Sequence, residues 1–106
     1  MSTDILDQLA QTIRARRTEP VDKSYTRQLL DAGPEQCAKK FGEEAVETVI
    51  AALVQTDGEL AAEAADLIYH LLVLLEARGV PLDDVLDILR GRMGISGLQE
   101  KASRNS

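Results

Sequence analysis

Apolar residues recur along the chain with the spacing of one face of an α-helix. The clearest runs are Ile5, Leu6, Leu9 and Ile13; Phe41, Ala45, Val49, Ala52 and Leu53; and Leu82, Val85, Leu86 and Leu89. No alternating strand pattern competes with this spacing. Pro34 and Pro81 stand where a proline can open a helix, and Gly33 and Gly79 where a glycine can close one. The pattern predicts an all-α fold with helices over about residues 3–16, 24–31, 34–55, 58–78 and 81–92.

The segment from Leu60 to Leu75 is apolar nearly all round, so its helix must be buried on most of its circumference. The chain has 106 residues, which is the size of one domain. Five helices of this total length can barely surround a helix that is apolar on all sides. We therefore expect one domain over residues 1–106, an antiparallel helical bundle that is completed by symmetric homodimerisation.

Composition narrows the classes of partner. The chain has 12 Lys plus Arg against 18 Asp plus Glu, a net charge of −6, so its surface repels nucleic-acid phosphates and anionic lipid. It has no Trp, one Phe and two Tyr, few for the stacking platforms of a single-strand binder. No apolar run is long enough to span a membrane. We expect no nucleic-acid or membrane partner, and the single cysteine, Cys37, favours a cytoplasmic location.

The C-terminal segment differs from the rest. Residues 93–106 contain Gly94 and Gly97 and end in polar residues, so composition predicts a mobile terminus. Residues 90–106 hold four basic residues and one acidic residue, a net charge of +3 in an acidic chain. This basic tail is either a solubilising end or a segment that closes over an anionic ligand.

Acidic residues form stripes on two neighbouring helices. At about 100° per residue, Glu63, Asp66 and His70 fall within an arc of roughly 60°. On the preceding helix, the residues gathered within about 100° are Lys40, Glu43, Glu44 and Glu47. The turn around residues 56–58 is short, so the two helices are antiparallel neighbours and the two stripes can face each other. The resulting motif is ExxE, a gap of fifteen residues, then ExxD.

Two facing carboxylate pairs without a partner would cost several kcal/mol each, so a cation is expected to compensate them. Oxygen ligands with no cysteine and a single nearby histidine favour Mg²⁺ or Mn²⁺ over zinc, and di-iron bundles need more histidines than this chain has. Such a magnesium site completes its shell with water and substrate phosphates. The expected ligand is therefore a nucleotide polyphosphate.

Each element of this motif also has a structural interpretation. Glu43, Glu44 and Glu47 alone fit a solvated helix face, because glutamate is a common helix former. His70 alone fits a hydrogen-bonded structural histidine. The combination of two acidic pairs on adjacent helices is what favours a metal site.

The sequence KFGEEAVE at 40–47, followed by EAADLIYH at 63–70, resembles the phosphoribosyl-ATP pyrophosphatase family, the second enzyme of histidine biosynthesis. That family belongs to the all-α nucleoside triphosphate pyrophosphohydrolase superfamily, with MazG-like proteins and dimeric dUTPases. SYTRQLL at 24–30 and SGLQEKASR at 96–104 also resemble this branch. The resemblance covers residues from about 20 to the C-terminus and implies a five-helix MazG-like fold.

The implied reaction is the Mg²⁺-dependent hydrolysis of phosphoribosyl-ATP to phosphoribosyl-AMP and pyrophosphate. The resemblance and the motif make Glu44, Glu47, Glu63 and Asp66 the expected metal ligands. The expected catalytic residues are Glu43, Glu44 and Glu47; Glu43 is either a ligand or the group that takes a proton from water. The expected substrate contacts are Tyr25, Lys39, Lys40, His70, Arg92, Lys101 and Arg104.

Two alternatives stay open at this point. A house-cleaning pyrophosphatase for non-canonical nucleoside triphosphates or dUTP would share the metal site, but it would not need the SYT and SGLQEKASR segments. A non-catalytic helical dimerisation or regulatory module would leave the acidic stripes as a tolerated polar seam.

Overall fold

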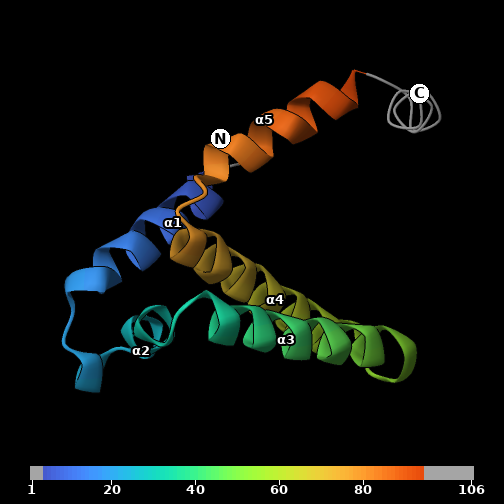
Figure 1. Ribbon diagram of the computed structural model, residues 1–106. Helices are drawn as coiled ribbons and strands as arrows, with labels where there is room; N and C mark the ends of the chain where they lie inside the picture. The colour runs from blue at the N-terminus through green and yellow to red at the C-terminus, as the bar shows by residue number, and fades with distance from the viewer. Residues whose placement is uncertain (1–3, 95–106) are drawn as a thin grey trace.

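The computed structural model describes residues 4–94 and is all-α over that range (Figure 1). Its elements are α1 (Asp4–Ala15), the 3-10 turns η1 (Arg16–Thr18) and η2 (Val21–Lys23), α2 (Tyr25–Ala32), α3 (Pro34–Val54), α4 (Asp57–Arg78) and α5 (Leu82–Met93). The five predicted helices are confirmed to within about two residues at each described boundary. Between residues 4 and 94, none of the helices has the length and hydropathy needed to cross a bilayer.

Local sequence fixes where the helices begin and end. The Ser24 hydroxyl accepts a hydrogen bond from the backbone N–H of Arg27 (3.1 Å), so Ser24 caps α2. α4 begins with a capping box, in which the Thr56 hydroxyl accepts from the Glu59 N–H and the Glu59 carboxylate accepts from the Thr56 N–H. α4 ends at Gly79, whose φ of 71° is left-handed and favours glycine.

The hairpin of α3 and α4 is the framework of the molecule. α1 and α2 pack against one end of it, formed by the beginning of α3 and the second half of α4 (Figure 1). The buried core lies there and consists of Ile13, Leu29, Cys37, Leu72 and Val73. The Arg17 guanidinium ties η1 to the same end, donating to the carboxylate (2.5 Å) and the backbone carbonyl (2.7 Å) of Glu76. The opposite end of the hairpin has no such cover within the described residues.

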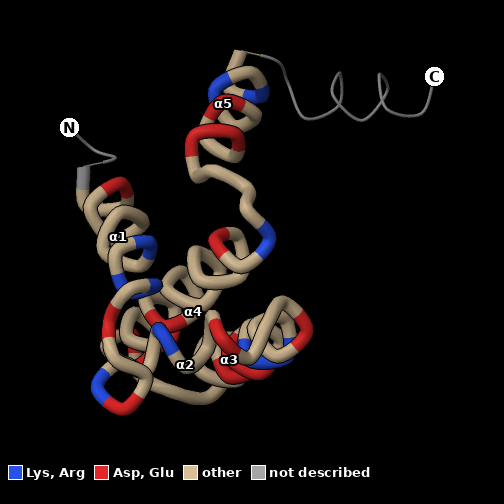
Figure 2. Tube along the Cα trace, turned by 60° about the vertical axis from the view of Figure 1, so that its left-hand side comes forward, with Lys and Arg blue, Asp and Glu red and all other residues tan. Residues whose placement is uncertain are grey.

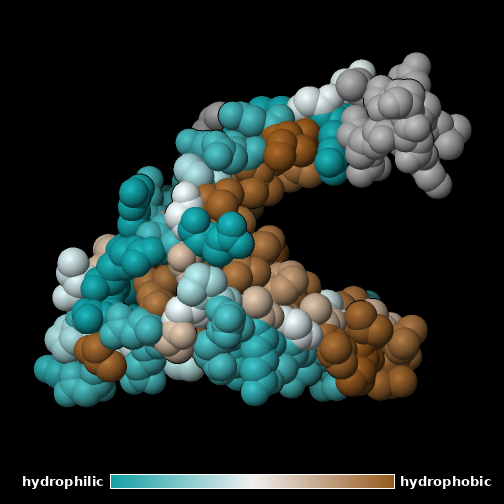
Figure 3. Space-filling model, in the orientation of Figure 1, coloured by the Kyte–Doolittle hydropathy of each residue, from teal (hydrophilic) through white to brown (hydrophobic). Residues whose placement is uncertain are grey.

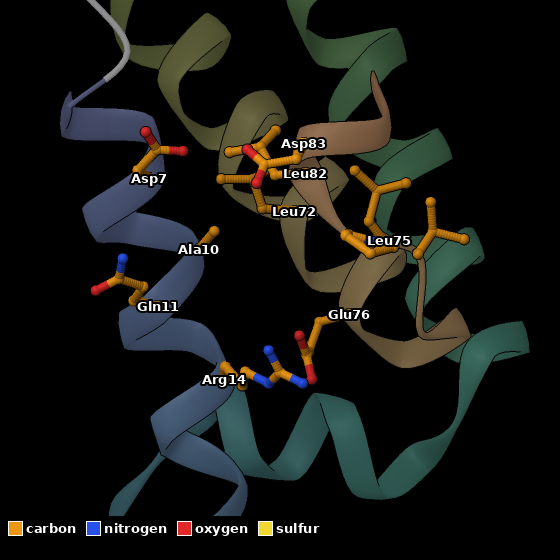
Figure 4. Close-up of a pocket in the computed structure, with 11 residues that line it drawn as sticks. Asp7, Ala10, Gln11, Arg14, Leu72, Leu75, Glu76, Leu82 and Asp83 are labelled. Carbon is orange, nitrogen blue, oxygen red and sulfur yellow. The ribbon is translucent and has the colours of Figure 1, made fainter. Parts of the chain in front are cut away.

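α5 extends away from this body and packs only slightly against the other described elements (Figure 1). Leu86 is buried near its start, but Ile88 and Met93 are exposed. A cavity of about 180 Å³ lies where α5 begins, between α1 and the end of α4; Arg14 and Glu76 are at one end of it and Leu72 and Leu82 line its apolar part (Figure 4). α5 therefore contacts the rest of the described chain mainly through its first turns.

Within one chain the apolar segment from Leu60 to Leu75 is only partly covered, as its pattern and the length of the chain predict. His70, Leu72 and Val73 are buried, but Ala61 and Ala65 are exposed and Ile68 is 43% exposed. Ala61 and Ala65 lie in the first half of α4, whereas α1 and α2 pack against its second half (Figure 1). One chain therefore leaves apolar surface of α4 exposed.

Replacing Thr56 tests the capping box that starts α4. We expect Thr56→Ala to lower the free energy of unfolding by about 1 kcal/mol, because the backbone N–H of Glu59 loses its acceptor. Urea denaturation followed by circular dichroism measures this change. The control is Thr12→Ala on the exposed side of α1, where alanine's higher helix propensity leaves stability equal or slightly raised. Equal losses in both variants would contradict a capping role.

Candidate metal centre

Carboxylates from α3 and α4 meet on one side of the hairpin. One carboxylate oxygen each from Glu44, Glu63 and Asp66 lies within 4.8 Å of the others. Glu47, one turn after Glu44, interacts with both Glu44 and Glu63. We call these four residues the carboxylate cluster. The prediction from helical spacing that the ExxE and ExxD pairs face each other is confirmed.

The carboxylate cluster contains buried oxygen atoms that lack a hydrogen-bond partner. One oxygen of Glu44 and one of Glu63, Oε2 in each case, is buried and has no hydrogen-bond partner. Burial raises the pKa of Glu44, and the neighbouring Glu47, Asp66 and Glu63 raise it further. Burial likewise raises the pKa of Glu63, with Glu47 and Asp66 adding to the shift. Buried carboxylate oxygens that face one another are the donor set that a hard divalent cation requires.

Thr48 fixes the two pairs relative to each other. Its hydroxyl lies 2.8 Å from the backbone carbonyl oxygen of Glu44 and 3.3 Å from that of Glu63, close enough to donate to either. This side chain therefore bridges α3 and α4 at the backbone of two cluster residues. Sequence analysis did not single out Thr48; its position four residues after Glu44, on the same face of the helix, was the available signal.

Lys40 and Glu43 lie at the rim of the cluster. The Lys40 ammonium is 3.2 Å from Glu43 Oε1, and this contact, followed by Tyr25 and Glu44, raises the pKa of Lys40. Acidic and lysine segments follow one another along α3 in Figure 2. Glu43 is exposed and paired with Lys40, so it lies outside the group of three close carboxylates. Lys39 is exposed.

His70 lies behind Glu44. Its side chain is buried, and Nε2 is 3.9 Å from Glu44 Oε1. Its ring makes edge-to-face contacts with Tyr25 and Tyr69. Burial, and then the charge of Lys40, lower the pKa of His70.

The structure does not bring all the expected substrate contacts to the cluster. Tyr25, Lys40 and His70 lie around it. Arg92 is near the end of α5, and α5 extends away from the hairpin of α3 and α4 (Figure 1). Lys101 and Arg104 lie outside the described residues.

Known proteins similar in sequence to this chain point to one family. Residues 6–93 match the family described as phosphoribosyl-ATP pyrophosphohydrolase. The chain is 60% identical over 96 residues to phosphoribosyl-ATP pyrophosphatase 1 of Bradyrhizobium diazoefficiens, which covers 91% of each chain. It is 54% identical over 104 residues to phosphoribosyl-ATP pyrophosphatase 1 of Rhodopseudomonas palustris, covering 98% of this chain and 97% of the relative. It is 53% identical over 100 residues to phosphoribosyl-ATP pyrophosphatase of Ruegeria sp., covering 94% and 95%.

The raised pKa values predict a pH dependence of stability for the protein freed of metal by a chelator. Because the folded-state pKa values of Glu44 and Glu63 exceed the ordinary value, the folded state binds more protons. Their contribution to stability is complete below the ordinary glutamate pKa and is lost as pH rises through the raised values. We expect Glu44→Gln combined with Glu63→Gln to stabilise the protein increasingly over that rise, measured by urea denaturation from acidic to neutral pH. Glu35→Gln, exposed at the start of α3, removes one charge outside the cluster, so twice its effect is the control for the two charges removed by the double variant. A pH-independent difference for the double variant would contradict the expectation.

Proposed function

The chain belongs to the phosphoribosyl-ATP pyrophosphohydrolase family, and we propose that it hydrolyses phosphoribosyl-ATP to phosphoribosyl-AMP and pyrophosphate, the second step of histidine biosynthesis, with Mg²⁺ held between α3 and α4. The observation that carries the metal-dependent part is the set of close carboxylates in which Glu44 and Glu63 each have a buried oxygen without a partner. Mn²⁺ fits the same oxygen donors.

Different carboxylates of the chain would bind the metal ion and accept the proton from water. Glu44, Glu63 and Asp66 would offer the three close ligand oxygens, and Glu47 the fourth. When bound, the divalent ion neutralises charge that develops on the pyrophosphate leaving group and helps to orient the attacking water. Glu47 and Glu43 are the carboxylates next to the three, and one of them would take the proton from that water.

Lys40 would bind a phosphate oxygen of the substrate. Its ammonium lies at the rim of the cluster and is partly exposed, so it can leave Glu43 for a more strongly charged partner. Tyr25 is half exposed on the same side and would form a wall of the substrate site. The other expected cationic contacts, Lys39, Arg92, Lys101 and Arg104, belong to the proposal through the family resemblance and the charge of a polyphosphate.

The metal and the substrate are tested together by measuring pyrophosphate release. We expect release from phosphoribosyl-ATP to require Mg²⁺ and to stop with EDTA. Asp66→Asn and Glu44→Gln are expected to lower kcat/KM by more than about 100-fold, because each removes a charged ligand oxygen. Both variants should keep the wild-type helical content by circular dichroism. Glu35→Gln, an exposed glutamate outside the cluster, should leave activity unchanged.

Equal or faster turnover of ATP, dUTP or non-canonical triphosphates would contradict the substrate, and undiminished activity in EDTA would contradict the metal.

We also propose that the protein is a homodimer. The outer face of α3 exposes large apolar side chains, among them Val46, Val49 and Leu53, the last 77% exposed. Apolar surface covers the tip of the hairpin and continues into the hollow between the hairpin and α5 (Figure 3). A second copy related by a twofold axis would cover the same apolar face on both chains at once.

Charge placed in that face tests the dimer. We expect Val49→Asp to shift the protein from dimer to monomer in sedimentation equilibrium at micromolar concentration, because each interface would bury two unpaired carboxylates. Gln36→Glu, an exposed change at the start of α3, should leave the dimer intact. A wild-type protein that is monomeric under these conditions would contradict the proposal.

A cytoplasmic location completes the proposal. Cys37, the sole cysteine of the chain, is buried, and its thiol donates to the backbone carbonyl of Leu29 (3.2 Å). The side chain acts as a small core residue, and a reducing compartment suits it.

A further inference from the structure

His70 is the only histidine in the chain, and no step of the proposed reaction uses it. Its side chain is 6% exposed, and its Nε2 faces Glu44 Oε1 at 3.9 Å. The other oxygen of the same carboxylate, Glu44 Oε2, is the buried atom without a partner. Glu44 therefore has one oxygen toward an imidazole and one that is free for a ligand.

We propose that His70 is a positioning residue for Glu44: its ring N–H, which at 3.9 Å is not hydrogen-bonded to Oε1 in this structure, closes on that oxygen when Oε2 takes a ligand and so orients the carboxylate in the carboxylate cluster. The inference rests on the proposed metal-dependent function and assigns a supporting residue to that site. A carboxylate that ligates a metal gains order from a hydrogen bond to its other oxygen, since binding then needs no further ordering of the side chain.

The surroundings of His70 separate this role from direct contact with substrate. The Tyr69 ring lies edge-on to the imidazole with centroids 5.0 Å apart, and the Tyr25 ring does so at 6.3 Å. Tyr25 is 50% exposed whereas His70 is buried, so a molecule that enters from solvent meets the Tyr25 ring first. Sequence analysis expected His70 to touch substrate; its enclosure between two aromatic rings favours a role through Glu44 instead.

The imidazole is itself held by α2. The Thr26 hydroxyl and the Tyr69 hydroxyl are hydrogen-bonded at 2.5 Å, which joins α2 to α4 next to His70. Ser24 caps the same helix and Tyr25 covers the outer edge of the imidazole. In the SYT segment at 24–26, Ser24 caps α2, Tyr25 packs against the imidazole and Thr26 is bonded to Tyr69. Together these contacts restrict how the His70 ring can move.

Binding of Mn²⁺ to the whole protein, measured by electron paramagnetic resonance without nucleotide, tests the proposal. His70→Leu keeps comparable apolar volume but has no donor, and we expect it to weaken Mn²⁺ binding by about 10-fold to 100-fold. His70→Gln restores an N–H donor and should recover most of that loss. In steady-state kinetics, saturating Mn²⁺ should return kcat of His70→Leu close to the wild-type value, with the KM for nucleotide unchanged.

Matched variants and outcomes separate the interpretations. Tyr69→Phe removes only the hydroxyl bonded to Thr26. A loss of Mn²⁺ affinity in this variant that is smaller than in His70→Leu supports the view that the bond between α2 and α4 helps to hold the imidazole in place. Wild-type Mn²⁺ affinity in His70→Leu, with a raised KM for nucleotide, would overturn the proposal in favour of substrate contact. Equal loss in His70→Leu and His70→Gln, together with loss of helical content, would overturn it in favour of a role in folding. A wild-type protein that binds no Mn²⁺, with or without nucleotide, would instead refute the proposed metal site itself.

Discussion

The close approach of like charges between α3 and α4 is the constraint on which the rest of the structure depends. Mutual repulsion and burial both disfavour the ionised carboxylates of Glu44 and Glu63, as their raised pKa values show. A flexible pair of helices would relieve this repulsion by moving apart. The hairpin resists because Thr48 bridges the two backbones and the capping box at Thr56 fixes the start of α4.

Stability is supplied at a distance from the site. The buried core of Ile13, Leu29, Cys37, Leu72 and Val73 gathers at the end of the hairpin where α1 and α2 pack. The carboxylate cluster lies between the middle of α3 and the first half of α4, and the tip of the hairpin beyond it is apolar and exposed. The chain therefore anchors the hairpin at one end and keeps the unfavourable charges on a segment that also exposes apolar surface.

Properties that repeat along the chain were predictable, and contacts between distant residues were not. Helical spacing, the proline at Pro34 and the glycine at Gly79 gave the helices and their ends, because these depend on neighbours in sequence. The facing of Glu44 with Glu63 followed from the same periodicity and a short turn. The bridge by Thr48, the bond between Thr26 and Tyr69 and the direction of α5 depend on how whole helices are placed, which no local pattern encodes. The incomplete cover of α4 within one chain was predictable from its apolar composition and the length of the chain, but the surface that would cover it was not.

The placement of the few cationic groups near the cluster explains how a divalent ion could be both attracted and held. An arginine or lysine inside the cluster would cancel the negative charge that draws the ion and would occupy the same oxygens. Lys40 is instead at the rim and paired with Glu43, where it can meet a phosphate without neutralising Glu63 or Asp66. The group that does face Glu44 from within is His70, whose pKa is lowered by burial and by Lys40, which favours the uncharged imidazole. A neutral donor can orient a carboxylate while leaving its charge available, and that combination is what a site for a hard cation and a polyphosphate requires.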